Sequence, residues 1–80
     1  MQDLNDMVYF AEVVDQGGFA AAGRSLGIPK SRLSRRVAEL EAQLGARLLQ
    51  RTTRRVALTD AGDAFYRHCA AMRESARAAQ

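Results

Sequence analysis

The sequence lacks the residues that disulfide scaffolds, metal centres and membrane spans require. Its 80 residues include one cysteine, one histidine, one proline and no tryptophan, and aromatic residues make up only 6%. A lone cysteine cannot form an internal disulfide, and Cys69 beside His68 does not make a set of metal ligands. No apolar run is long enough to span a membrane. We therefore expect no metal, no other cofactor and no membrane contact.

Features of secreted proteins and of enzymes are also missing. The N-terminus has no basic segment followed by an apolar one, as a signal peptide would, which predicts a cytoplasmic protein. Ser31, Ser34 and His68 have no plausible triad geometry, and there is neither a glycine-rich phosphate loop nor a cluster of acids around a base. We expect a protein that is not an enzyme.

Charge is small in total, at +3, but unevenly distributed along the chain. Residues 1–23 carry four acids and no base, residues 24–55 carry nine bases and two acids, and residues 56–80 carry three of each. Positive charge confined to one segment is typical of a nucleic-acid-binding face. With 48% hydrophobic residues, the chain is expected to fold as one small domain.

The segment 28–44 predicts an amphipathic helix. At about 100° per residue one stripe is apolar, formed by Leu33, Val37, Leu40 and Leu44. The opposite side is basic and hydroxyl-bearing toward its N-terminal half, with Lys30, Ser31, Arg32, Ser34, Arg35 and Arg36. Such a face, at a helix end whose N–H groups favour phosphate, suits a nucleic-acid backbone. An arginine-rich face is also typical of a helix that is only solvated.

Two further helices are expected before this one. The first covers residues 4–16, with an apolar stripe of Leu4, Met7, Val8, Ala11 and Val14 and a second strip of Tyr9 and Val13. A short alanine-rich helix over residues 19–26 follows a pair of glycines, and Gly27 and Pro29 separate it from the basic helix. This order predicts a helix-turn-helix, whose second helix enters the DNA major groove.

The remainder predicts a hairpin and a last helix. Segments 47–51 and 55–59 read as two short strands, and a helix is expected from Thr59 or Asp60 to the end of the chain. We expect a mainly α fold with a small β-hairpin: a winged helix-turn-helix domain over residues 1–58 and a linker or dimerisation helix over 59–80.

An apolar stripe on the last helix predicts a homodimer. Its members are Phe65, Tyr66, Cys69, Met72 and Ala76. The alternative is that the stripe folds back on Tyr9 and Val13 of the same chain, and the two contacts can coexist. Because the helix is expected to run to Gln80, we also expect the chain to be part of a longer protein.

The order of motifs resembles the N-terminal DNA-binding domain of LysR-type transcriptional regulators, over essentially the whole chain. The matching run is GGFAAAGRSLGIPKSRLSRRVAELEAQLGARLLQRTTRRVALTDAGDAFY. Within it the succession of Leu26-Gly27-Ile28, Leu33-Ser34-Arg35, Leu44-Gly45 and Leu58-Thr59-Asp60-Ala61-Gly62 is specific, although each motif alone is weak.

The resemblance implies a bacterial, nucleoid-associated homodimer that regulates transcription by reading an interrupted palindrome in double-stranded DNA. It implies that Lys30, Ser31, Arg32, Ser34 and Arg35 face the major groove. It implies that Arg51, Thr52, Thr53 and Arg54 approach phosphates or the minor groove. A small-molecule effector would act only through a C-terminal domain that this chain does not contain.

Two departures from the family pattern matter for the prediction. Gly23 stands where an alanine is usual, which should cost about 1 kcal/mol in helix propensity. Arg32 and Arg36 make the recognition helix more basic than usual. The alternative function is a helical assembly module that dimerises without reading DNA.

Overall fold

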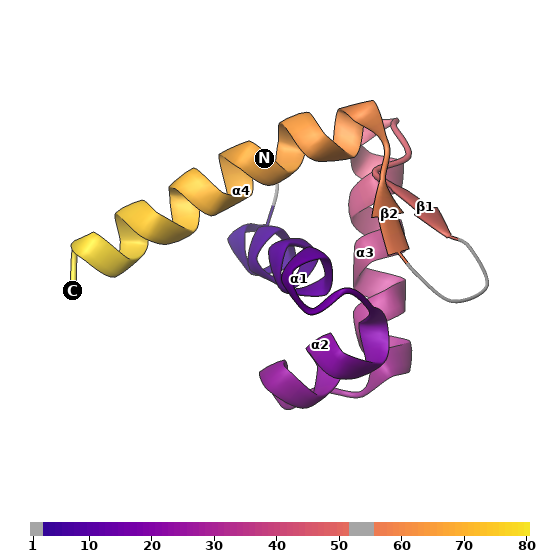
Figure 1. Ribbon diagram of the computed structural model, residues 1–80, viewed down its shortest axis with the longest axis horizontal. Coiled ribbons are helices and arrows are strands. Elements are labelled where there is room, and N and C mark those ends of the chain that lie inside the picture. Colours follow the sequence, from indigo (N-terminus) through magenta and orange to yellow (C-terminus); the bar gives the residue numbers. More distant parts are fainter. Residues whose placement is uncertain (1–2, 52–55) are drawn as a thin grey trace.

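The first helix, α1 (Leu4–Gln16), begins where the Asp3 carboxylate accepts a hydrogen bond from the N–H of Asn5 at 2.8 Å. It ends at Gly17, whose φ of 80° lies in the left-handed region that favours glycine. These bounds confirm the predicted helix. The computed structural model describes residues 3–51 and 56–80, and α1 contacts each of the other helices (Figure 1).

The predicted helix-turn-helix is formed by α2 (Phe19–Leu26) and α3 (Lys30–Leu44). In the turn, the N–H groups of Gly27 and Ile28 both donate to the Gly23 carbonyl, at 2.9 and 3.0 Å. A Cβ at Gly23 would lie 2.9 Å from the carbonyl oxygen of Ile28. Gly23 is unfavourable for helix propensity, but its lack of a side chain lets the turn pack closely against α2.

A hairpin follows, in which β1 (Leu49–Arg51) pairs antiparallel with β2 (Val56–Leu58). Two strands alone are marginal in water, so the pair needs support from the helices. The Glu41 carboxylate at the end of α3 accepts the N–H groups of Leu48 and Leu49, at 2.8 and 3.2 Å. Both leucines are buried. The predicted hairpin is thus confirmed, and α3 holds it at its first strand.

Contacts to the DNA backbone are expected from Arg51, Thr52, Thr53 and Arg54. Thr52, Thr53 and Arg54 lie outside the described residues, and Arg51 is described only as the last residue of β1, paired with Val56. The role expected for these four residues stays a prediction.

The last helix, α4 (Asp60–Ala78), is capped by Thr59 and begins at Asp60, the two residues between which the sequence left its start open. It ends at Ala78, two residues before the expected Gln80. The Thr59 hydroxyl accepts the N–H of Gly62 at 2.9 Å and donates to the Arg47 carbonyl at 2.6 Å. A Cβ on Gly62 would overlap the carbonyl oxygen of Leu48. The first turn of α4 therefore lies directly on the chain that leads into the hairpin, and from there α4 runs across the molecule to its far side (Figure 1).

The core lies between α1, α3, the hairpin and α4. Its largest fully buried side chains are Phe10, Val13, Leu33, Val37, Leu40, Leu48, Leu49 and Cys69. On α3 this confirms the predicted stripe, with Leu44 partly buried at its end.

On α1 the predicted stripe is partly wrong. Leu4 is 56% exposed, whereas Phe10 and Val13 are fully buried. The buried line of the helix begins with Asp6, which is itself buried, and continues through Phe10 and Val13 at spacings of four and three. The predicted stripe is correct at Ala11, which is fully buried, and Val13 belongs to the predicted second strip. Apolar periodicity does not reveal the line as a whole because its first member is a carboxylate.

Candidate nucleic-acid interface

The basic side of α3 faces away from the core. Its exposed residues are Lys30, Ser31, Arg32 and Arg35, and Ser34 is partly buried. Among residues 3–51 and 56–80, no carboxylate forms an ion pair with Lys30, Arg32 or Arg35. Within the described parts of the chain, these three cations are therefore available to an anionic partner.

The start of α3 adds to the positive character of this side. The helix begins directly after Pro29, with no side-chain cap and no acidic residue in its first turn. Its first N–H groups lack intrahelical partners, and the positive end of the helix dipole points the same way. Both effects favour an anion near Lys30 and Ser31.

Arg36 is the exception, because its guanidinium is bound by two carboxylates at the start of α1. Its Nε donates to Asp6 Oδ1 at 2.8 Å, and a terminal nitrogen donates to Asp3 Oδ2 at 3.0 Å. The Asp6 side chain is only 5% exposed, so water competes little for the pair. The hydrogen bond and negative charge of Asp6 raise the pKa of Arg36. The sequence predicts Arg36 among the DNA-facing residues, but its guanidinium is turned toward α1.

Asp6→Asn is expected to lower the free energy of unfolding by about 1 to 2 kcal/mol, because it leaves Arg36 without its main partner. A larger loss is not expected, since the Arg36 side chain is 35% exposed. Chemical denaturation measures the difference. The control is Glu74→Gln, which breaks an ion pair whose side chains are 71% and 68% exposed and should change stability by less than about 0.5 kcal/mol. Equal losses in the two variants would show that the Asp6–Arg36 pair stabilises the fold no more than an exposed ion pair does.

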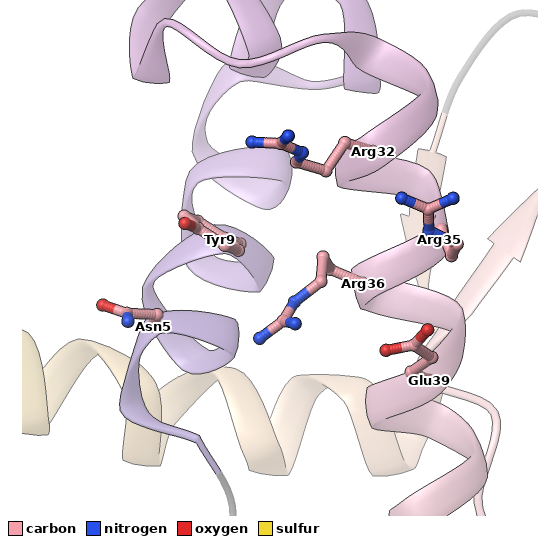
Figure 2. A pocket seen from close by; sticks show the side chains of 6 residues that line it. All are labelled: Asn5, Tyr9, Arg32, Arg35, Arg36 and Glu39. Atoms are coloured by element: carbon pink, nitrogen blue, oxygen red, sulfur yellow. The ribbon is translucent and has the colours of Figure 1, made fainter.

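A groove of about 420 Å³ lies between α1 and α3 (Figure 2). It is lined by Asn5, Tyr9, Arg32, Arg35, Arg36 and Glu39. The sequence predicts Tyr9 as part of an apolar strip and not as a site residue. Its ring does pack against the core, but its hydroxyl has no partner among the described residues. The sequence does hold one indication of this role. Phenylalanine would fill the same apolar position as Tyr9, so the tyrosine hydroxyl is not needed for packing.

The first half of α4 packs on α1 of the same chain. The rings of Phe65 and Phe10 lie 5.7 Å apart, centroid to centroid, and the Tyr66 hydroxyl donates to Asp15 at 2.5 Å. Cys69 is fully buried, and this burial raises the pKa of its thiol to about 11. The stripe therefore folds back on α1 of the same chain, as one alternative expected, and its contacts there are to Phe10 and Asp15. Tyr9, one of the two residues expected at this contact, lines a groove between α1 and α3. Cys69, expected at a dimer contact, offers no surface to a partner because the chain's own core covers it.

An ionic contact continues this attachment one turn later. Arg73 lies 2.9 Å from Asp15 and 3.9 Å from Glu12, both on α1. Of the residues expected at a dimer contact, Met72 is partly buried and Ala76 is exposed. The free surface of α4 thus lies toward its C-terminal end.

The sequence also matches a family profile described as "Bacterial regulatory helix-turn-helix protein, lysR family", over residues 4–63. This range runs from the start of α1 into the first turn of α4. The chain belongs to the LysR family.

Relatives of this LysR-family chain are named as transcriptional regulators. An HTH-type transcriptional regulator of Xanthomonas campestris pv. campestris is 60% identical over 67 residues, which are 84% of this chain and 20% of that protein. The probable HTH-type transcriptional regulator LtrA of Klebsiella pneumoniae is 49% identical over 76 residues, which are 95% of this chain and 25% of that protein. The chain therefore spans about a fifth to a quarter of the length of these relatives.

Solved structures of the family share the fold. The BenM DBD/catB site 1 DNA complex has a TM-score of 0.91 and 33% identity, over 95% of this chain and 84% of that one. The CbnR DBD–DNA complex has a TM-score of 0.90 and 33% identity, over 98% of this chain and 90% of that one. Full-length AphB, a virulence activator of Vibrio cholerae, has a TM-score of 0.89 and 34% identity, over 95% of this chain and 26% of that one. These likenesses confirm the predicted winged helix-turn-helix with a long final helix.

The described ranges of this LysR-family chain contain neither a cluster of metal ligands nor a membrane-spanning helix. No three histidine, cysteine, aspartate or glutamate residues there come together as ligands for a metal ion. No helix there combines the length and apolar character needed to cross a membrane.

Proposed function

We propose that this LysR-family domain binds double-stranded DNA sequence-specifically and is the DNA-reading part of a bacterial transcriptional regulator. The observation that carries the proposal is that Lys30, Arg32 and Arg35, on the second helix of the helix-turn-helix, are exposed and have no ion-pair partner among the described residues. Leu33 and Val37 fix this helix in the core from behind. The names of the relatives and the DNA complexes of BenM and CbnR support the proposal.

In this function α3 enters the major groove. Arg32 and Arg35 are the long donors that reach guanine edges bidentately or bind phosphate. Shorter polar contacts come from Lys30, Ser31 and Ser34. Arg36 acts indirectly, because its ion pair with Asp6 holds α3 against α1. Arg51, Thr52, Thr53 and Arg54 at the hairpin tip are proposed to approach the backbone or the minor groove.

The domain is proposed to work as a homodimer through α4, so that two copies of α3 read the two halves of an interrupted palindrome. Because Phe65, Tyr66 and Cys69 pack on α1, we place the contact between copies on the later part of α4, with Met72 and Ala76. A small-molecule effector would bind another domain of a longer protein. The site of action would be the nucleoid in the cytoplasm, without a cofactor and without enzymatic activity.

In vitro selection tests this function: the 80-residue chain is used to enrich binders from a randomised duplex library at near-physiological salt. We expect a two-fold symmetric motif with fixed half-site spacing, because each copy contributes one reading helix. Salt-sensitive binding that enriches no motif would show that the domain holds DNA without reading it. No binding, together with a dimer in ultracentrifugation, would favour an assembly module that uses α4.

A further inference from the structure

We infer that the groove between α1 and α3 binds a phosphate of the DNA backbone, with Tyr9 and Arg32 as donors. The inference rests on the proposed function and adds α1, a helix outside the helix-turn-helix, to the DNA interface.

The positive charge of the groove is concentrated at one end. Arg36 lines it, but its charge is offset by Asp6 and Asp3. The one acidic lining residue, Glu39, lies two turns along α3 from Arg32 and at the opposite end of the groove (Figure 2). An anion is therefore favoured at the end of the groove where Arg32 lies, since Arg32 has no ion-pair partner among the residues that the structure describes.

Tyr9 supplies a neutral donor to the same groove. Its ring packs against the core, so the hydroxyl is held in place at little further loss of conformational entropy. The hydroxyl has no partner within the described parts of the chain, and Tyr9 lines the same groove as Arg32. Tyrosine hydroxyls and arginine guanidiniums are common donors to DNA phosphate oxygens.

The position of the groove points to a backbone phosphate rather than to a separate anion. Arg32 and Arg35 belong both to the groove and to the exposed side of α3 that the proposed function places in the major groove. A helix in the major groove is flanked by a phosphate backbone on each side. Because α1 lies beside α3 across the groove, it meets one of these backbones. A contact there would set the rotation of α3 over the bases without reading sequence itself.

Tyr9→Phe tests the inference, in anisotropy titrations with the selected duplex and with a duplex of random sequence. We expect about tenfold weaker binding to both, because a phosphate contact carries no sequence information. The dependence of log affinity on log salt should keep its slope, since no charge is removed. The Tm should not change, because the hydroxyl has no partner in the described structure.

Arg32→Gln is the second variant. It should lower the salt slope by about 0.9, as expected for one lost phosphate contact. Tyr9→Phe should then weaken binding less in the Arg32→Gln background than in the wild type, because the two side chains would hold the same phosphate.

Three results would overturn the inference while leaving the proposed function intact. These are unchanged affinity in Tyr9→Phe, a loss confined to the selected duplex, and full additivity of the two substitutions. A thermal unfolding experiment provides a further test, in which inorganic phosphate is compared with chloride at equal ionic strength. If phosphate raised the Tm of the wild type but not that of Tyr9→Phe, and if Tyr9→Phe bound DNA as tightly as the wild type, the groove would bind free phosphate and not a phosphate of the DNA. Failure of the wild type to bind any duplex would overturn the proposed function and the inference together.

Discussion

Arg35→Ala is expected to weaken binding to the selected duplex by about tenfold to a hundredfold. Arg35 is exposed, has no partner among the described residues and lies in the middle of the basic side of α3. One good bidentate contact to a base contributes about 1 to 3 kcal/mol of discrimination, and about 1.4 kcal/mol corresponds to a factor of ten. Fluorescence anisotropy over a series of salt concentrations measures both affinity and salt slope.

The salt series also shows which group Arg35 binds. A phosphate contact would lower the slope by about 0.9, whereas a base contact would mainly reduce the preference for the selected duplex over a random one. The control is Arg67→Ala on α4, which removes the same charge from a side chain that is 77% exposed and paired with Asp63. It should leave affinity nearly unchanged. An Arg35→Ala variant with wild-type affinity and slope would refute the assignment of α3 as the reading helix.

Gly62→Ala is expected to lower the free energy of unfolding by about 3 kcal/mol, toward the upper end of the effects of overpacking. Gly62 lies in the first turn of α4, and an added Cβ would overlap the carbonyl oxygen of Leu48. That carbonyl cannot retreat freely, because it accepts the N–H of Thr59 at 3.0 Å. For a domain of this size the loss corresponds to a fall in Tm of more than about 10 °C.

Helix propensity alone predicts the opposite sign, since alanine is favoured over glycine in a helix by about 1 kcal/mol. The control is Ala64→Gly, at an exposed position in the same part of α4. It should be destabilised by about 1 kcal/mol through propensity only. A Gly62→Ala variant as stable as the wild type in thermal unfolding would show that the hairpin can move away from α4.

The contacts of α1 bear on how the proposed dimer would read DNA. One end of α1 holds α3 through Asp6 and Arg36, and the other end holds α4 through Asp15, which contacts Tyr66 and Arg73. The reading helix and the helix proposed for dimer contact are therefore positioned on the same element. In the proposed function, the spacing of the two half-sites depends on how rigidly α1 joins them.

Much of the fold could be predicted because its signals are local. Helix α1 has the predicted bounds, since Asp3 and Gly17 act on the backbone within a turn of the helix ends. The buried stripe of α3 follows from the 3.6-residue period and from the absence of any polar residue on that stripe. The hairpin and the start of α4 follow in the same way from the strand pattern and from the Thr59 cap.

The sequence by itself determined the order of the elements, the basic side of α3 and the family, because propensity, capping and periodicity act over a few residues. Only the tertiary structure decided which way the Arg36 guanidinium turns, since its partner Asp6 is 30 residues away. It also decided that Tyr9 lines a groove and that Cys69 is buried in the core. These outcomes depend on how each helix is rotated about its axis relative to its neighbours. That rotation is set by packing and ion pairs between residues far apart in the sequence, which the residue pattern of a single helix does not reveal.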